Sequence, residues 1–207
     1  TSWLRTFVMI IALLLGGLNG GALRAEDAGA LNTERIEQLV APIALYPDDL
    51  LSQVLMASTY PLEVVEAARW IKENPKVTGQ ALEDAMQKQP WDASVKALTA
   101  VPQTLAMMSD QLKWTQDLGD AFLAQQSDVF DAVQRLRARA DATGNLKSTP
   151  QQKITRVSRP AGAPAGAPAT AYTIVPSNPN EYYVPIYDPG VVYGAWPYAT
   201  YRPFYWY

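Results

Sequence analysis

Prolines divide the first two thirds of this chain into short helical segments. Four of them stand where an amphipathic stretch begins: Pro47, Pro61, Pro90 and Pro102. Proline suits that position because the first N–H groups of a helix have no partner within it. Asn74 precedes Pro75, and a residue before proline avoids the helical conformation, so one helix is expected to end there. Residues 33–145 are therefore expected to fold as a succession of short helices.

Apolar residues recur at helical spacing throughout this stretch. The pattern predicts helices that start at Asn32 or Thr33, that span about 47–58 and 61–73, that run from Thr78 to about Lys88, that open at Pro90 and Pro102, and that extend from about Ser109 to Ala142 with a break near Ser127. Acidic residues in the first turns favour the positive helix ends, and Gly144 suits the end of the last helix. Residues 26–145 hold 18 acids and 10 bases. We therefore predict a mainly α fold, with an acidic multi-helix domain over residues 32–146.

The composition changes abruptly after this domain. Residues 147–171 are first basic and then a Pro-Ala-Gly repeat without large side chains, which is typical of a linker. Residues 172–194 predict a short β segment, with strand candidates at 172–175, 182–187 and 191–193 and a turn at Asp188-Pro189-Gly190. Residues 195–207 form an aromatic tail, which we expect to continue beyond Tyr207 in a longer protein. The complete prediction is a mainly α, multi-helix domain followed by a Pro/Ala/Gly linker and a small β/aromatic C-terminal segment.

The first 25 residues resemble a secretory signal peptide. Arg5 precedes an apolar run over residues 7–18, and small residues follow at Ala22 and Ala25, which suit a signal peptidase. The alternative is an uncleaved N-terminal membrane anchor, because the uncharged stretch 6–23 is 18 residues long and a spanning helix needs about 20. Both interpretations predict an exported protein of the periplasm or cell envelope, anchored in the inner membrane if the segment is retained.

The chain contains no cysteine and no histidine. Ser-His-Asp and Cys-His catalysis, zinc sites built on thiolate or imidazole, and disulfides are therefore excluded. Neither a phosphate-binding loop nor a serine-hydrolase motif is present. No catalytic residue, no metal site and no cofactor is predicted. Nucleic acid is not an expected partner either, because the acidic domain repels phosphate.

Carboxylates are the remaining route to catalysis. Asp48-Asp49 and Glu83-Asp84 are adjacent pairs, and adjacent residues on a helix point about 100° apart, so neither pair can share a proton by itself. Asp48 and Asp49 are explained by their position at a helix start. The carboxylates therefore have ordinary structural explanations, and the chain is not predicted to be an enzyme.

Aromatic residues concentrate in the last part of the chain. Trp70, Trp91 and Trp114 in the helical region are expected to pack at the edge of the core. Packing onto the helical domain is also expected for Tyr182, Tyr187 and Tyr193. Six aromatic side chains of the tail are predicted to be exposed and to contact a partner or another copy of the chain, which makes them the candidate binding residues: Trp196, Tyr198, Tyr201, Phe204, Tyr205 and Trp206.

Several motifs together resemble an uncharacterised bacterial family known as domain of unknown function 3300. They are Leu39-Val40-Ala41-Pro42-Ile43-Ala44-Leu45-Tyr46-Pro47-Asp48-Asp49-Leu50-Leu51, Trp91-Asp92-Ala93-Ser94-Val95, Trp114-Thr115 with Leu118-Gly119, Val133-Gln134-Arg135-Leu136-Arg137, Tyr183-Val184-Pro185-Ile186-Tyr187-Asp188-Pro189 and Val191-Val192-Tyr193-Gly194. The resemblance covers about residues 33–194. It implies an exported or membrane-associated protein, and it supplies no activity, cofactor or catalytic residue.

These observations favour a non-enzymatic interaction or structural module of the cell envelope. Its expected partners are an envelope protein or a cell-wall component, with membrane contact through residues 6–23 if that segment is uncleaved. The alternative is a carboxylate-dependent hydrolase acting on cell-wall glycan or peptide. A third interpretation is membrane attachment at both ends, with the aromatic tail at the lipid interface.

Overall fold

The computed structural model describes residues 30–158, 169–178, 181 and 183–206. The predicted signal peptide or anchor and most of the Pro-Ala-Gly repeat lie outside the described residues. Within the described part, nine helices and one two-stranded antiparallel sheet confirm the predicted mainly α fold. The helices are α2 (Thr33–Val40), α3 (Asp48–Ala57), α4 (Pro61–Glu73), α5 (Gln80–Gln87), α6 (Ala93–Leu98), α7 (Pro102–Asp110), α8 (Leu112–Ala124), α9 (Gln126–Ala142) and α10 (Pro189–Val192); the strands are β1 (Gln152–Ser158) and β2 (Thr170–Pro176).

Capping side chains and prolines mark where several of the helices begin. The Asn32 side chain accepts a hydrogen bond from the backbone N–H of Arg35 and caps α2, and Asp92 caps α6 in the same way through Ser94. Pro61 and Pro102 occupy the first positions of α4 and α7, as predicted. The predicted stretch from about Ser109 to Ala142 contains the end of α7, then α8 and α9. Its break at Gln125 is close to the one predicted near Ser127, and the break at Gln111 was not predicted.

Helix α9 ends at a turn that only glycine adopts easily. Gly144 has φ +74°, its N–H donates to the carbonyl of Asp141 (2.9 Å), and the N–H of Asn145 donates to the carbonyl of Ala140 (2.7 Å). These two bonds form a Schellman motif, which satisfies carbonyls that the helix itself leaves unpaired. The predicted glycine cap is confirmed.

The β segment differs from its prediction. Residues 172–175 do form a strand, as part of β2, but its partner β1 lies in residues 147–171, which were predicted to be linker. Ile154 pairs with Ile174, and both are buried against the helices. The linker prediction was wrong for residues 152–158 because this strand is basic and buries only its first residues, so it lacks the alternating pattern of a half-buried strand.

The other two predicted strands are absent from the described residues. Residues 183–188 have no regular structure, and Pro185 there lacks the N–H that a strand would need. The predicted turn at Asp188-Pro189-Gly190 is instead the start of helix α10, because the Asp188 side chain accepts from the Gly190 N–H (2.8 Å). Pro189 thus occupies the first helical position, as Pro61 and Pro102 do in α4 and α7, and Asp188 caps the helix as Asp92 caps α6.

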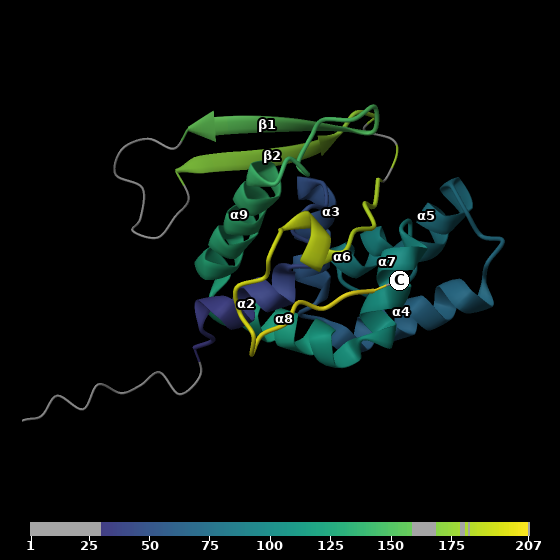
Figure 1. The fold of residues 1–207 in the computed structure, drawn as a ribbon. Helices are drawn as coiled ribbons and strands as arrows, with labels where there is room; N and C mark the ends of the chain where they lie inside the picture. Colours follow the sequence, from purple (N-terminus) through teal and green to yellow (C-terminus); the bar gives the residue numbers. More distant parts are fainter. Residues whose placement is uncertain (1–29, 159–168, 179–180, 182, 207) are drawn as a thin grey trace, which may run out of the picture.

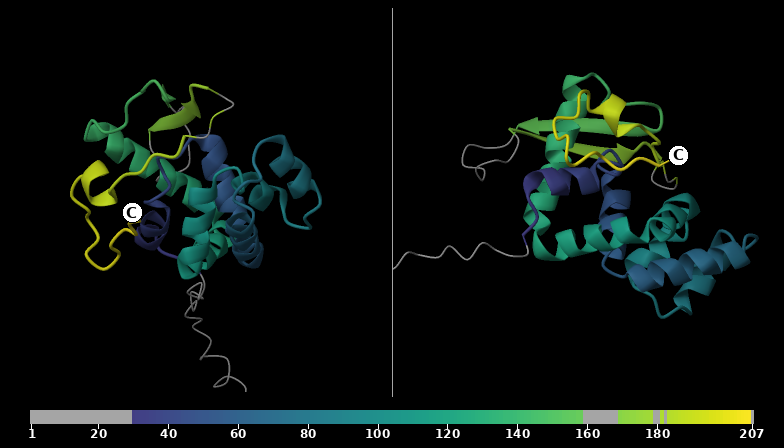
Figure 2. Two further views of the ribbon diagram at one scale, coloured as in Figure 1. Left: turned by 90° about the vertical axis from the view of Figure 1, so that its right-hand side faces the viewer. Right: turned by 60° about the horizontal axis from the view of Figure 1, so that its bottom comes forward.

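The elements assemble around one core (Figure 1). The hairpin of β1 and β2 packs on α9 and α3, and α4 and α5 lie at the opposite end of the helical bundle. The C-terminal segment after β2 returns past α9 and runs beside α2, as two further views also show (Figure 2). Fully buried side chains from widely separated segments fill the centre, among them Leu39, Leu55, Leu105, Trp114, Leu118 and Leu136.

Gly119 allows α8 to approach the end of α3. A Cβ at this position would overlap the Ser58 carbonyl oxygen and lie 2.7 Å from the carbonyl carbon, and these backbone atoms cannot move easily. Gly119→Ala should therefore lower the free energy of unfolding by about 2–3 kcal/mol, although alanine favours the helix by up to about 1 kcal/mol. Urea denaturation measures the change. Gln116→Ala, at an exposed site on the same helix, is the matched control, and equal stability of the two variants would contradict the close packing.

Candidate functional site

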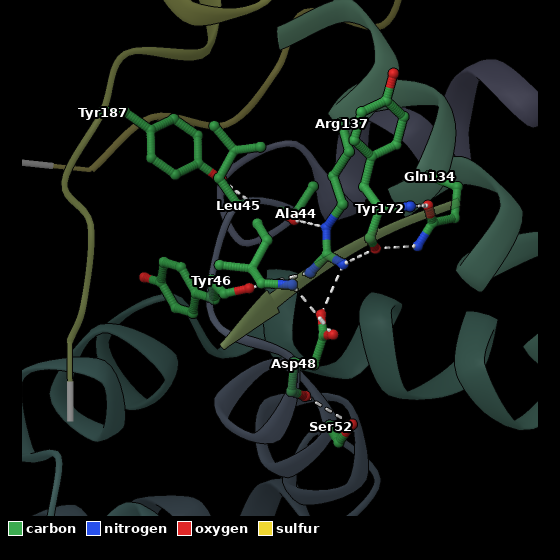
Figure 3. Close-up of polar contacts among 10 residues, drawn as sticks. Ala44, Leu45, Tyr46, Asp48, Ser52, Gln134, Arg137, Tyr172 and Tyr187 are labelled. Atoms are coloured by element: carbon green, nitrogen blue, oxygen red, sulfur yellow. Dashed lines mark hydrogen bonds and ion pairs between the residues drawn. The ribbon is translucent and has the colours of Figure 1, made fainter. Parts of the chain in front are cut away.

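A buried arginine lies where three distant segments of the chain meet (Figure 3). Arg137 on α9 is only 1% exposed, and its guanidinium reaches four oxygen atoms. Nε donates to the Ala44 carbonyl (2.8 Å), Nη2 to the Tyr46 carbonyl (3.1 Å), and Nη1 to both the Tyr172 carbonyl (2.9 Å) and Oδ1 of Asp48 (2.6 Å). The planar guanidinium is suited to this role because its donors point in fixed, divergent directions.

Asp48 extends this network into the hairpin. Its Oδ1 pairs with Arg137, and its Oδ2 accepts a hydrogen bond from the Ile174 N–H on β2 (3.2 Å). Gln134, one turn before Arg137, holds β2 from the other side, because its amide exchanges two hydrogen bonds with the backbone of Tyr172. The Leu-Tyr-Pro-Asp-Asp segment is therefore tied to α9 and to β2, and Asp48 has a structural role.

Three tyrosines surround the turn between α2 and α3. Burial raises the pKa of Tyr46 to about 12. The hydroxyls of Tyr187 and Tyr193 both donate to the Ala41 carbonyl (2.9 and 2.7 Å), and burial raises the pKa of both phenols well above the ordinary value. All three side chains stay neutral at physiological pH. The predicted packing of Tyr187 and Tyr193 is confirmed, and Tyr182 lies outside the described residues.

Two further acids hold the segment that contains Trp91. Glu66 on α4 accepts from the Trp91 indole N–H (3.0 Å), and Glu63, one turn earlier, accepts from the Asp92 backbone N–H (2.5 Å). The pKa of Asp92 is lowered, mainly by its hydrogen bond with the Ser94 side chain. These carboxylates fix the start of α6. Asp49, Glu83 and Asp84 are exposed on the surface.

All three tryptophans of the helical region pack against the core, but Trp114 lies deeper than the edge position predicted for it. Trp114 is buried, and its indole N–H donates to the Leu39 carbonyl (2.9 Å). Trp91 is buried against Glu66, and Trp70 is half-buried at the edge of the core.

The predicted exposure of the aromatic tail was wrong for most of its residues. Trp196, Tyr198, Tyr201, Phe204 and Trp206 are half-buried, and only Tyr205, at 40%, is exposed. Trp206 contacts Trp114 edge to face at 4.7 Å between ring centroids and stacks on Phe204 at 6.1 Å. The helical bundle leaves apolar and cationic surface open beside α2 and α9, and the tail covers it. Whether these six residues bind a partner stays a prediction.

Arginines from two helices hold the tail. Arg139 on α9 lies over the rings of Trp196 (5.7 Å to the centroid) and Tyr198 (5.5 Å), and Arg35 on α2 lies over Phe204 (5.9 Å). Such cation–π contacts are worth about 0.5–1 kcal/mol each at partly exposed sites. Gln38 adds a hydrogen bond from its amide to the Arg202 carbonyl (2.5 Å).

Beneath the tail, a buried carboxylate pairs with two arginines of α9. Glu37 is 1% exposed, and its Oε1 and Oε2 lie 2.6 Å from Arg135 and 3.2 Å from Arg139. Neither Glu37 nor Arg137 was assigned a role from the sequence. One signal pointed to Arg137, because it stands four residues after the buried Val133 and therefore lies on nearly the same face of the helix.

A cavity of about 300 Å³ lies between α7, the turn after α2 and the C-terminal segment. Pro42, Tyr46, Thr104 and Met107 form its inner wall, and residues 184–187 together with Trp206 form its rim. No acidic side chain of the described residues lines it. The cavity can hold a compact apolar group, but it presents no carboxylate for acid–base chemistry.

Neither a metal-binding cluster nor a membrane-spanning helix occurs among the described residues. No cluster of three or more acidic side chains is arranged to hold a metal ion. None of the described helices is both long enough and apolar enough to cross a membrane.

Comparisons with known proteins agree with the motifs. A family model with the description "protein of unknown function (DUF3300)" matches residues 32–207. The uncharacterized protein YacH of Escherichia coli (strain K12) is 47% identical over 197 residues, which cover 85% of this chain and 32% of that protein. The chain thus spans about a third of the length of this relative. No solved structure matches.

Removing the guanidinium of Arg137 should destabilise the whole domain. Arg137→Met leaves three backbone carbonyls without their donor and should lower the free energy of unfolding by about 3 kcal/mol or more. Arg137→Lys keeps the charge but cannot reach all four acceptors, so an intermediate loss is expected. Urea denaturation measures both. Arg69→Lys at an exposed site should change the midpoint little, and an Arg137→Lys variant as stable as that control would contradict the role of the network.

Proposed function

The chain belongs to the family of proteins of unknown function DUF3300, and on that premise we propose that it is a non-enzymatic interaction or structural module of the cell envelope. The observation that carries the proposal is the use of its carboxylates. Asp48, Glu63 and Glu66 all accept hydrogen bonds that hold the fold together. A carboxylate that is engaged in this way is poorly placed to donate or accept a proton from a substrate.

The cavity supports the same proposal. Proline, aliphatic, methionine and aromatic side chains form most of its lining, together with the polar side chains of Gln103 and Thr104, so the cavity favours apolar contact. Ile186 at the rim is 77% exposed, so an approaching molecule meets an aliphatic side chain there. A hydrolase of glycan or peptide would instead need two carboxylates that face a common cleft.

The proposed location rests on the first 25 residues. Their order of basic, apolar and small residues supports export to the periplasm or cell envelope. N-terminal sequencing of the mature protein decides between a cleaved signal peptide and a retained membrane anchor. A mature chain that begins within residues 1–20 would support the anchor.

Replacing carboxylates with amides distinguishes an interaction or structural module from a carboxylate-dependent hydrolase. Asp48→Asn places an NH₂ group opposite one of the two donors that Asp48 accepts from, the Arg137 guanidinium or the Ile174 N–H. It should therefore lower the free energy of unfolding by about 2 kcal/mol. Asp49→Asn, at an exposed site, should not lower it. Purified protein incubated with peptidoglycan should release no glycan or peptide fragment detectable by mass spectrometry. Fragments that disappear in Glu63→Gln or Glu66→Gln at unchanged stability would contradict the proposal.

A photo-crosslinking residue tests for a partner at the cavity. We expect benzoylphenylalanine at Ile186, placed in intact cells, to give a discrete crosslinked product, because this side chain projects from the rim. The same residue at Val191, which is 70% exposed on α10 and does not line the cavity, is the matched control. Equal products from the two positions would mean that the cavity does not select a partner.

A further inference from the structure

The aromatic segment, defined here as residues 195–206, lies across a face built from three helices. We call this the acceptor face; it comprises Asn32, Arg35 and Gln38 of α2, Trp114 of α8 and Arg139 of α9. Figures 1 and 2 show the segment, in yellow, running beside α2, and Trp206 at its end contacts Trp114 of α8. The chain therefore shows which kind of peptide fits this face: an extended segment rich in aromatic residues and proline.

Side chains supply the contacts between segment and face. Gln38 donates to the Arg202 carbonyl, Asn32 to the Tyr201 hydroxyl (3.2 Å) and Arg139 to the Tyr198 hydroxyl (3.2 Å). Among the described residues, no backbone-to-backbone hydrogen bond connects 195–204 to the helices. Segments held in this way open at lower free energy than the core, because no hydrogen-bonded ladder or helix must break.

Docking also leaves polar groups unsatisfied. Nε1 of Trp206 and Nη1 of Arg139 are both inaccessible to solvent and have no hydrogen-bond partner among the described residues. An unpaired buried donor costs about 1–3 kcal/mol. These costs offset part of the cation–π and aromatic contacts, so the net free energy that holds the segment is modest.

The segment keeps internal contacts that do not depend on the acceptor face. The Trp196 indole N–H donates to the Tyr201 carbonyl (2.7 Å), Trp196 packs edge to face on Tyr198 (5.7 Å), and Phe204 stacks on Trp206. A detached segment with such contacts loses less conformational freedom when it docks again.

The chain before the segment is firmly fixed. Thr143 and Asn145 both donate to the Val192 carbonyl (2.8 and 3.1 Å), and Tyr193 is hydrogen-bonded to Ala41. Gly194 follows with φ +71°, a conformation that suits glycine. Any detachment is therefore confined to the residues after Gly194.

We propose that the acceptor face is an exchangeable docking surface that takes the aromatic segment of a second copy of this chain. The second copy is the partner because its residues 195–206 match the face in every contact that the structure shows. Exchange of an identical segment between copies is a low-cost route to association, since the segment makes the same interactions on a neighbouring copy as on its own chain. The proposal rests on the proposed function and gives the structural module its means of self-association.

Binding of the segment in trans is measured with a fluorescent peptide of residues 195–206. The receptor is the full chain with Trp196→Ser and Phe204→Ser, which weakens its own segment and leaves the face intact. Fluorescence anisotropy should show saturable binding, and the wild-type chain, whose face is occupied, should bind at least about tenfold more weakly. Adding Arg139→Gln should weaken binding at least about tenfold, whereas adding Arg156→Gln, on the hairpin and away from the segment, should not.

Complementation tests the source of the segment. The Trp196→Ser/Phe204→Ser chain has an open face and a defective segment, and the Arg139→Gln chain has a weakened face and an intact segment. Mixed at high micromolar concentration, they should form a heterodimer in sedimentation velocity, while the doubly substituted chain alone stays monomeric. Circular dichroism checks folding, and Phe204→Ala, which removes only the ring beneath Arg35, replaces the double variant if that variant unfolds.

Two results would overturn the proposal. One is a folded open-face variant that does not bind the peptide, and the other is a mixture that stays monomeric although the peptide binds. Neither result concerns catalysis, which the release of peptidoglycan fragments measures separately, so this proposal and the proposed function can fail independently.

Discussion

The buried guanidinium of Arg137 determines how the distant segments of this fold pack against α9. A buried cation is tolerated only where its donors are satisfied, and here four oxygen atoms from the turn after α2, from the start of α3 and from β2 surround it. The acceptor residues lie 35 to 93 residues from Arg137 along the chain. Because the hairpin also depends on Asp48 for the Ile174 N–H, the Arg137–Asp48 pair joins α9 and α3 to β2.

Local chemistry made much of the helical architecture predictable. Proline at Pro61 and Pro102 and the capping side chains of Asn32 and Asp92 act over three or four residues, so their effect is visible in the sequence. The same reasoning applied at Asp188-Pro189 predicts α10. A turn was predicted there because the neighbouring tyrosines and valines, which favour strands, were given more weight. The helix-start pattern at this position is nevertheless as complete as at the other positions.

The remaining features depend on partners that are distant in sequence. Strand β1 forms because β2 pairs with its backbone, and its own side chains carry little signal. Glu37 and Arg137 become meaningful only when α9 is placed beside α2, since each is an ordinary charged residue in its own helix. The aromatic tail was expected to be exposed because its composition is typical of a contact surface. Composition could not show that Arg35, Arg139 and Trp114 provide that surface within the same chain.

Two arginines of α9 hold different parts of the structure: Arg137 holds the core, and Arg139 holds the exchangeable aromatic segment. Arg137 faces the core and bonds to backbone carbonyls, so its contacts persist as long as the domain is folded. Arg139, two residues later, faces outward and contacts the rings of Trp196 and Tyr198 and the carboxylate of Glu37. If the aromatic segment leaves, Arg139 and Arg135 still neutralise Glu37, so the exposed face needs no rearrangement of the core. The segment can therefore detach at a cost limited to its own contacts, whereas loss of the Arg137 network would open the whole domain.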